Sequence, residues 1–187
     1  MIKTLVLFSG GLDSAVLLCI YAPRALAVSF DYGQSHSIEI EHAARFCKAR
    51  EIEHLIAPIT VAGGSLLDPA QSSPIAPARN LIMLATAASI AKQKGCDQLA
   101  IGVTAEDQDL FHDCRPAFLA NLNAILQAQG LPTARAPLAG LNKRQITQLA
   151  HRLGVDPKET WSCYHPTNDR PCGECLACDV RKKGQTP

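Results

Sequence analysis

The sequence has few aromatic residues, no marked excess of either charge and no long apolar run. Aromatic residues make up 5% of the 187 positions, and 18 basic residues face 17 acidic ones, which gives a formal net charge of +1. This balance argues against binding of nucleic acid through a basic surface. No apolar run approaches the roughly 20 residues that span a bilayer, and a strand pattern begins at Thr4, which leaves no room for a signal peptide. We therefore expect a cytoplasmic globular protein that partners neither a membrane nor nucleic acid.

Cysteine is plentiful for a reducing compartment, and the eight residues fall into two sets. Scattered positions are expected to be small core residues: Cys19, Cys47, Cys96 and Cys114. The other four cysteines lie close together near the C-terminus with the spacing C-x8-C-x2-C-x2-C: Cys163, Cys172, Cys175 and Cys178. Overlapping C-x-x-C turns with one further thiolate suit tetrahedral Zn²⁺ in a closed structural site, and an iron–sulfur cluster is the lesser alternative. The spacing predicts a metal-binding tail at 161–187, appended to a domain at 1–160.

Apolar runs alternate with helical patterns along most of the chain. Buried parallel strands are expected at 4–8, 25–30, 54–57 and 98–103. Helices are expected at about 14–21, 37–50, 79–94, 116–129 and 143–153. The last of these has Asn142 as its expected N-cap and Gly154 at its expected end.

This alternation predicts an α/β fold with a doubly wound parallel sheet. Ligands of such sheets bind at the carboxyl ends of the strands, where Ser9, Asp31 and Thr104 stand. Residues 62–77 are rich in glycine, proline and serine, and we leave open whether they form a mobile lid or a slack connection.

The segment Ser9-Gly-Gly-Leu-Asp-Ser14 joins the first predicted strand to the first predicted helix. Its two glycines let the backbone approach an anion closely, and the N–H groups and dipole of the first helical turn attract phosphate. The hydroxyl groups of Ser9 and Ser14 add donors. A carboxylate at Asp13 would repel phosphate unless Mg²⁺ lies between the two, as is usual at nucleotide sites. The segment therefore predicts a site for ATP and Mg²⁺, and the other common glycine-rich phosphate motifs do not occur in the chain.

The pattern S-G-G-x-D-S resembles the pyrophosphate loop of the ATP-pyrophosphatase (PP-loop) superfamily. The whole chain resembles the 7-cyano-7-deazaguanine synthases, the QueC family. This second resemblance rests on the loop and the cysteines together with Asp31-Tyr-Gly-Gln34, His36, Glu39, Pro77-Ala-Arg-Asn80, Asp113-Cys-Arg-Pro116, Phe118, Lys143 and Thr160-Trp-Ser-Cys-Tyr164. It implies an adenine nucleotide alpha hydrolase-like fold and an ATP-dependent carbon–nitrogen ligase whose copies tend to pair into a homodimer.

That family converts 7-carboxy-7-deazaguanine and ammonia to 7-cyano-7-deazaguanine, in queuosine-type biosynthesis, with two ATP molecules. The resemblance implies that a carboxylate oxygen and then an amide oxygen attack the α-phosphorus of ATP, and that each oxygen leaves with AMP. Contacts to the nucleotide are then expected from Ser9, Gly10, Gly11, Leu12, Asp13, Ser14, Ser29, Phe30, Arg79 and Asn80, with the substrate as the alternative partner of the last two. Asp13 is expected to hold Mg²⁺, and Lys143 and Arg181 are candidate catalytic cations for the charge on the phosphates. The alternative for Lys143 is a solvated helix residue.

His36, Asp113 and Arg115 are the expected substrate contacts. A carboxylate pairs well with the N1–H and amino edge of a guanine-like base, arginine suits a planar carboxylate, and histidine moves protons near neutral pH. Asp113 also stands where the N-cap of the helix at 116–129 belongs, so capping is the alternative to ligand contact. The alternative for His36 is an ordinary loop histidine.

Other functions stay open beside the full synthase. Ser35, Ala117 and Leu176 depart from the residues that the resemblance predicts. At Ala117 either a neighbour replaces the missing acidic group or the ligand differs, so a diverged ligase is the alternative to the full synthase. Such a ligase would form only an amide, with ammonia or with an amine on a protein or nucleic acid. A tRNA-modifying module is disfavoured because four cysteines are assigned to metal and a basic patch is lacking. A zinc-stapled structural domain requires that ATP not bind.

Overall fold

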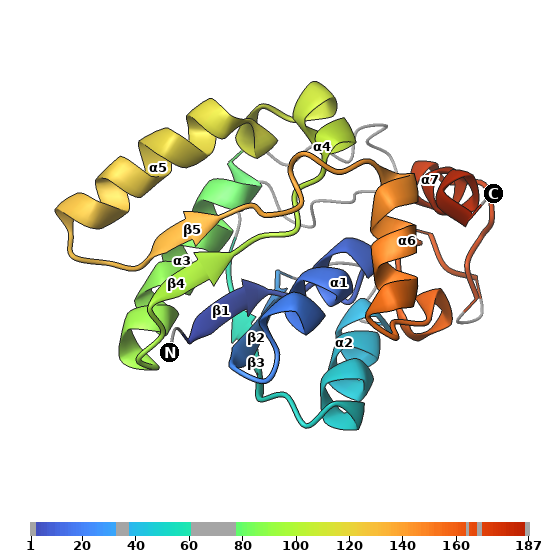
Figure 1. Ribbon diagram of the computed structural model, residues 1–187, viewed down its shortest axis with the longest axis horizontal. Coiled ribbons are helices and arrows are strands. Elements are labelled where there is room, and N and C mark those ends of the chain that lie inside the picture. Colours follow the sequence, from blue (N-terminus) through green and yellow to red (C-terminus); the bar gives the residue numbers. More distant parts are fainter. Residues whose placement is uncertain (1–2, 33–37, 61–77, 164, 168–169, 186–187) are drawn as a thin grey trace.

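The computed structural model describes residues 3–32, 38–60, 78–163, 165–167 and 170–185 (Figure 1). The expectations for Ser35, His36, Tyr164 and residues 62–77 fall outside these ranges. The described strands form one sheet in the order β3-β2-β1-β4-β5. They are β1 (Thr4–Leu7), β2 (Ala25–Asp31), β3 (His54–Pro58), β4 (Gln98–Ala100) and β5 (Thr133–Arg135). Every pairing is parallel, and the order reverses between β1 and β4, which is where sheets of this kind bind ligands.

Helices cover both faces of the sheet. One face carries α1 (Leu12–Tyr21), α2 (Ile38–Ala49) and α6 (Lys143–Arg152). The other carries α3 (Arg79–Gln93) and α5 (Pro116–Ala128). Val6 and Ala27 pack on the first face, and Leu5 and Val28 on the second, because successive side chains of a strand point in opposite directions. The strands are therefore apolar along their length, and the predicted doubly wound α/β fold is confirmed.

Several short elements were not predicted from the sequence. They are β5, α4 (Ala105–Leu110), the 3-10 turns η1 (His112–Cys114) and η2 (Pro157–Glu159), and α7 (Leu176–Gln185). β5 has three residues with the sequence TAR, and α4 is acidic, so neither presents an apolar run. Helix α1 begins two residues earlier than expected, which places Asp13 and Ser14 in its first turn.

Helix α6 has the ends that the sequence predicts. The Asn142 side chain accepts the main-chain N–H of Gln145 at 2.9 Å and caps the first turn. Gly154 follows the last turn with φ +68, a conformation that favours glycine. Helix α7 packs against α6, and Figure 1 shows the two side by side at one end of the molecule.

Two of the scattered cysteines are core residues, as expected. Cys47 is buried between the sheet and α2, and Cys96 is buried on the opposite face. Cys19 is partly buried and packs against the first face. Trp161, Cys163 and Cys178 form a separate small cluster in the tail. Among the described helices, none has the length and hydropathy that crossing a bilayer requires.

Candidate active site

The turn between β1 and α1 has its own hydrogen-bond network. The Ser14 hydroxyl donates to the carbonyl of Gly11 at 3.1 Å and accepts the main-chain N–H of Ser9 at 3.3 Å. The main-chain N–H of Gly11 donates to Ser9 Oγ at 3.3 Å, and the two serine oxygens lie 3.1 Å apart. The first turn of α1, from Leu12, leaves main-chain N–H groups that no helical carbonyl satisfies. We call residues 9–14 the phosphate corner, since a bonded turn with amides at a helix start suits an anion.

Glycine is required at one place around this corner and favoured at another. Gly10 has φ +80, and a Cβ there would lie 2.6 Å from the carbonyl oxygen of Glu39. Gly102, just beyond β4, lies so close that a Cβ would be 3.2 Å from the main-chain nitrogen of Ser14. The role of Gly102 was not predicted. The signal was available, because an isolated glycine within an apolar run often marks a close approach of backbones.

Asp13 and Lys143 meet beside the phosphate corner. Lys143 Nζ donates to Asp13 Oδ2 at 2.6 Å. The Lys143 side chain is 21% exposed and the Asp13 side chain 27% exposed. Burial raises the pKa of the Asp13 carboxyl more than the neighbouring ammonium lowers it. Burial alone would lower the pKa of Lys143, but the charges of Asp13, Asp107 and Glu106 raise it. Lys143 is therefore a charged residue of the site and not a solvated one.

Glu106 joins this pair without having been predicted. Its Oε1 accepts the main-chain N–H of Lys143 at 2.9 Å, and the start of α4 is held there by a 3.0 Å bond from Ala105 N–H to the carbonyl of Leu141. Its Oε2 is buried and has no hydrogen-bond partner within the described ranges. Asp107, by contrast, is occupied as the cap of α4, since Thr104 donates to it twice at 2.8 Å. The only sequence signal for Glu106 was an acidic stretch after a strand end.

The side chains of Ser29 and Phe30 lie inside the fold. The Ser29 hydroxyl donates to the carbonyl of Phe8 at 2.6 Å and lies 2.7 Å from His54 Nε2. Phe30 belongs to the core on the face of α3 and α5. Their side chains thus support the end of β1, and contact with a nucleotide stays a prediction.

Asn80 and Asp113 are brought together, with a correction to the expected cap. The N-cap of α5 is Arg115 and not Asp113. The Asp113 carboxylate instead accepts the main-chain N–H of Asn80, at 3.3 Å, in the first turn of α3, where Arg79 also lies. The Asn80 amide donates back to the Asp113 carbonyl at 3.4 Å and to Cys114 Sγ at 3.5 Å. The expectation that Asp113 caps the helix at 116–129 is therefore wrong, because its carboxylate is used at the start of α3. The expectation of a core position for Cys114 is also wrong, since it is a partly buried neighbour of this contact and belongs to no described core cluster.

Arg115 is exposed and is held by its own turn. Its Nε donates to the carbonyl of Gln108 at 3.1 Å, and its Nη1 lies 3.1 Å from His112 Nδ1. Among the described residues, no hydrogen bond or ion pair connects Asp113 or Arg115 to the phosphate corner. Asp113 and Arg115 thus lie apart from the corner in the hydrogen-bond network, and Asn80, an expected nucleotide contact, is grouped with Asp113.

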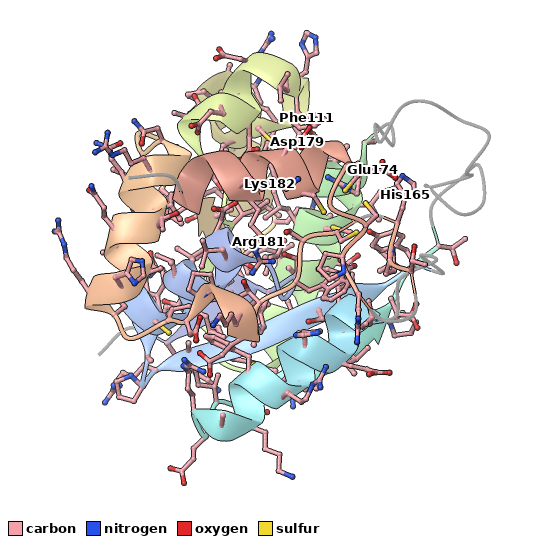
Figure 2. All side chains as sticks on the ribbon, turned by 90° about the vertical axis from the view of Figure 1, so that its right-hand side faces the viewer. Phe111, His165, Glu174, Asp179, Arg181 and Lys182 are labelled. Carbon is pink, nitrogen blue, oxygen red and sulfur yellow. The ribbon has the colours of Figure 1, made fainter. Side chains whose placement is uncertain are left out.

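Arg181 lies on the side of α7 that faces the body of the molecule (Figure 2). Its guanidinium donates to the carbonyl of Thr160 at 3.0 Å, to Thr160 Oγ1 at 2.8 Å and to Ser162 Oγ at 3.1 Å, and also to the carbonyl of Pro157. Burial lowers its pKa, and nearby Cys178 and Asp156 act in the opposite direction. The expected phosphate contact of Arg181 stays a prediction, while the structure shows it bound to residues 157–162.

The four tail cysteines converge on one point. All of their sulfur atoms lie within 4.8 Å of one another, with 3.6 Å between Cys163 and Cys172 and 4.0 Å between Cys172 and Cys178. The main-chain N–H groups of Glu174 and Cys175 lower the pKa of Cys172 to about 7. Four sulfur atoms in this arrangement can hold a metal ion.

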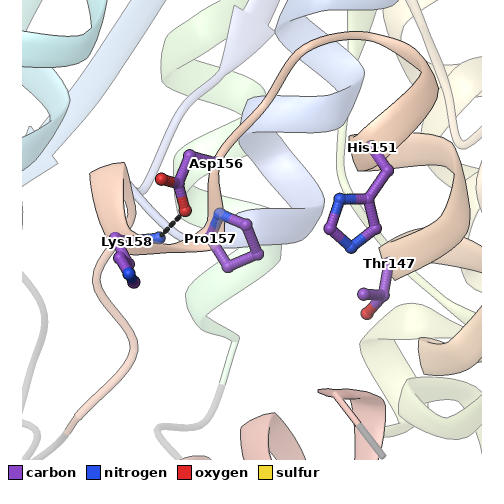
Figure 3. A pocket seen from close by; sticks show the side chains of 5 residues that line it. All are labelled: Thr147, His151, Asp156, Pro157 and Lys158. Atoms are coloured by element: carbon purple, nitrogen blue, oxygen red, sulfur yellow. Dashed lines mark hydrogen bonds between the residues drawn. The ribbon is translucent and has the colours of Figure 1, made fainter. Parts of the chain in front are cut away.

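A pocket of about 300 Å³ opens elsewhere, between α6 and η2 (Figure 3). It is lined by Thr147, His151, Asp156, Pro157 and Lys158. The Asp156 carboxylate accepts the main-chain N–H of Lys158 at 2.9 Å, so it is used in capping η2. None of the lining residues belongs to the phosphate corner or to the cysteine cluster.

Comparison with known proteins decides the family. The family model of the queuosine biosynthesis protein QueC matches residues 3–186. The chain belongs to the QueC family. A 7-cyano-7-deazaguanine synthase from Leptospira interrogans is 36% identical to it, over 97% of this chain and 86% of that protein. One from Aquifex aeolicus is 35% identical, over 96% of this chain and 94% of that protein. The QueC family is enzymatic, so the chain is an enzyme.

Solved structures support the fold of this QueC member. The U34-tRNA thiolase NcsA from Methanococcus maripaludis, solved with its [4Fe-4S] cluster, aligns with a TM-score of 0.58 at 22% identity, over 98% of this chain and 64% of that one. An NH3-dependent NAD synthetase from Campylobacter jejuni aligns with a TM-score of 0.54 at 15% identity, over 84% of this chain and 66% of that one. At these identities the likeness establishes the fold alone, and nothing about the nucleotide or the substrate.

Proposed function

We propose that this QueC enzyme converts 7-carboxy-7-deazaguanine and ammonia to 7-cyano-7-deazaguanine at the expense of two ATP molecules. The observation that carries the proposal is the phosphate corner with the Asp13–Lys143 pair beside it, in a chain that matches QueC over residues 3–186. The names of the relatives agree with this product.

The chemistry consists of two rounds of adenylation. In the first, a carboxylate oxygen attacks the α-phosphorus of ATP, pyrophosphate leaves, and ammonia displaces AMP from the acyl adenylate to give the amide. In the second, the amide oxygen attacks another ATP, and loss of AMP with a proton leaves the nitrile. Both rounds need an oxygen aimed at the same phosphorus, so one phosphate corner serves both.

The chain's own groups hold the leaving pyrophosphate. The main-chain N–H groups of Gly10 and Leu12 and the Ser9 hydroxyl donate to it. The Gly11 N–H and the Ser14 hydroxyl, which bond to Ser9 Oγ and to the Gly11 carbonyl in the structure, share these bonds with it when ATP binds. Lys143 supplies a positive charge where negative charge develops, and such fixed charges account for most of the acceleration in phosphoryl chemistry.

The residues around Asp13 fit a divalent cation. Magnesium prefers carboxylate oxygens together with phosphate oxygens. The Asp13 carboxylate lies beside the corner, and the buried Oε2 of Glu106 has no partner among the described residues, although its charge acts on Asp13. We propose that Mg²⁺ bound here with ATP neutralises charge on the phosphates.

The cysteine cluster fits a single Zn²⁺. Four thiolates at about 2.3 Å from one zinc ion lie about 3.8 Å apart, and the observed separations are 3.6 and 4.0 Å for two of the pairs. All four positions are taken by protein, so we propose a structural role, with Cys163, Cys172, Cys175 and Cys178 as the ligands.

Asp113, Arg115 and Asn80 remain our candidates for the deazaguanine end of the site, with Arg79 at the same helix start. The Asp113 carboxylate has a second oxygen, Oδ1, whose described contact is a weak one to Cys114 Sγ at 3.9 Å. That oxygen is available for the amino edge of a guanine-like base. His36 as a proton carrier, ammonia as the nitrogen donor and a homodimer stay proposals on the resemblance alone.

Mass analysis of the products tests the function. The protein is incubated with 7-carboxy-7-deazaguanine, ATP, Mg²⁺ and ammonium, and we expect the nitrile with two AMP and two pyrophosphate per substrate. Lys143→Ala should form neither the nitrile nor AMP. Arg152→Ala, at an exposed residue of α6, should form both. Amide with one AMP would refute the full synthase and support the amide-forming ligase, and absence of AMP would refute adenylation.

A further inference from the structure

We propose that Arg181 is a positioning residue for the phosphate corner. It holds residues 157–163, here called the strap, against Gly10, and thereby sets the direction of an N–H group that receives pyrophosphate. The proposal rests on the proposed binding of ATP at the corner, and it deepens that function by joining the cysteine tail to it.

The strap contacts the corner directly. The main-chain N–H of Trp161 donates to the carbonyl of Gly10 at 2.8 Å, and a Cβ on Gly11 would lie 3.5 Å from the carbonyl oxygen of Trp161. A peptide unit is planar, with its C=O and N–H pointing in opposite directions. Pinning the carbonyl of Gly10 therefore fixes the direction of the Gly11 N–H, which donates to Ser9 Oγ at 3.3 Å and is shared with pyrophosphate in the proposed complex. This matters because Gly10, at φ +80, has more backbone freedom than other residues.

Arg181 holds the strap from the other side. Both terminal nitrogens of its guanidinium are engaged, Nη1 with Ser162 Oγ and Nη2 with Thr160 and the carbonyl of Pro157. Two of these acceptors, Thr160 and Ser162, stand immediately before and after Trp161. The paired nitrogens are the edge by which arginine grips phosphate, so a direct phosphate contact would require these bonds to break. Arg181 is thus built to order the strap.

The metal cluster and Arg181 share one helix. Cys178 and Arg181 are three residues apart on α7 and hence on one side of it. The indole N–H of Trp161 donates to the carbonyl of Cys163 at 3.0 Å, and its ring lies in the cluster with Cys163 and Cys178. The strap is therefore fixed at Cys163 by the cluster and at Thr160 by Arg181, with Trp161 between them.

The test compares Arg181→Ala and Arg181→Lys with Arg152→Ala, which removes the same charge from an exposed position. Bound zinc, the Kd for ATP by calorimetry, and hydrogen exchange of the Trp161 amide are measured on the full chain. We expect Arg181→Ala to keep its zinc, to bind ATP about tenfold more weakly, since bonds from a charged donor are lost, and to exchange the Trp161 amide faster. Arg181→Lys should recover part of both losses, and Arg152→Ala should match the wild type.

A double-mutant cycle separates positioning from direct contact. Thr160→Val removes one acceptor of Arg181 without touching the corner, and it serves as the test variant even if Arg181→Ala does not fold. We expect Thr160→Val to weaken ATP binding, and the double variant to be no weaker than Arg181→Ala alone, because both act through one strap. Additive losses, or an unchanged Trp161 amide in Arg181→Ala, would overturn the proposal. Failure of the wild type to bind ATP would instead overturn the proposed function, and amide exchange would still decide whether Arg181 holds the strap.

Discussion

Removing Lys143 should destabilise the protein in a way that depends on pH. Two unit charges 2.6 Å apart attract by about 6 kcal/mol at the effective dielectric constant of about 20 that describes partly buried sites. Much of this is offset by desolvation of the two groups. Breaking a buried pair costs about 3–5 kcal/mol because it leaves an unpaired charge. Because the Asp13 side chain is 27% exposed, we expect a smaller loss than for a fully buried pair. Lys143→Met should lower the free energy of unfolding by about 2–3 kcal/mol at pH 8.

The sign of the pH dependence follows from Asp13. Burial already raises the pKa of its carboxyl, and the ammonium of Lys143 is what limits the rise. Without Lys143, the folded protein holds a proton that the unfolded chain, with an aspartate pKa of about 3.9, has released. The free energy of unfolding of Lys143→Met is therefore largest near the unfolded pKa. It should fall by about 1.4 kcal/mol per pH unit as the pH rises toward the folded pKa.

Urea denaturation at pH 5, 7 and 8 measures this effect, with zinc present throughout. Lys143→Met should approach the wild-type midpoint at pH 5 and fall below it at pH 8. The double variant Asp13→Asn/Lys143→Met should regain most of the loss at pH 8, because no charge is left unpaired, although it should form no AMP. A wild-type midpoint for Lys143→Met at pH 8, or a double variant no more stable than Lys143→Met, would refute the coupling.

Three further predictions concern the corner, the tail and the core. Gly10→Ala should cost about 1–3 kcal/mol for its left-handed backbone alone and abolish ATP binding by calorimetry, whereas Gly140→Ala, where a Cβ meets nothing within 4 Å, should do neither. Cys175→Ser should lower bound zinc from one ion per chain and reduce the melting temperature, and metal analysis showing four irons per wild-type chain would contradict the zinc assignment. Burial lowers the pKa of His54 in the folded protein. The neutral His54 side chain therefore contributes to stability above the pKa of histidine in the unfolded chain, about 6.5, and this contribution is lost as the pH falls below that value. The urea midpoint of His54→Gln should therefore fall less between pH 7 and pH 5 than that of the wild type.

The parts of the site that the sequence could predict are those whose residues are neighbours in the chain. The phosphate corner is six consecutive residues, and the cysteine ligands share one short segment, so their spacing alone fixes much of the geometry. The order of strands and helices also follows from local patterns, because each buried strand needs an apolar run. Even so, a strand that is buried on both faces does not reveal which side chains remain accessible, and Ser29 points inward.

The rest depends on contacts between distant parts of the chain. The Asp113 carboxylate accepts the N–H of Asn80 at the start of α3, and the two residues are 33 positions apart in the sequence. Glu106 holds Lys143 across 37 positions. Such pairs are set by the packing of η1 against α3 and α5 and by the bond that holds the start of α4 to Leu141. Neither α4 nor η1 has an apolar pattern that sequence periodicity could detect. Arg181 was predicted as a cation for phosphate because its charge was visible and its partners, all neutral oxygens, were not.

The contact between strap and corner gives the proposed metal-binding tail a place in this fold. Among the described residues, the buried cluster of the tail consists of Trp161, Cys163 and Cys178, with Ile38, Cys172 and Cys175 packed against it. This is too little apolar surface to hold a polar segment in one place. A structural zinc ion in a small peptide contributes about 10–16 kcal/mol of apparent binding energy, which is enough to order such a segment. Since Trp161 bonds to Gly10, order in the tail is passed to the backbone of the phosphate corner. A cluster with no open coordination position can thus affect a reaction in which it takes no chemical part.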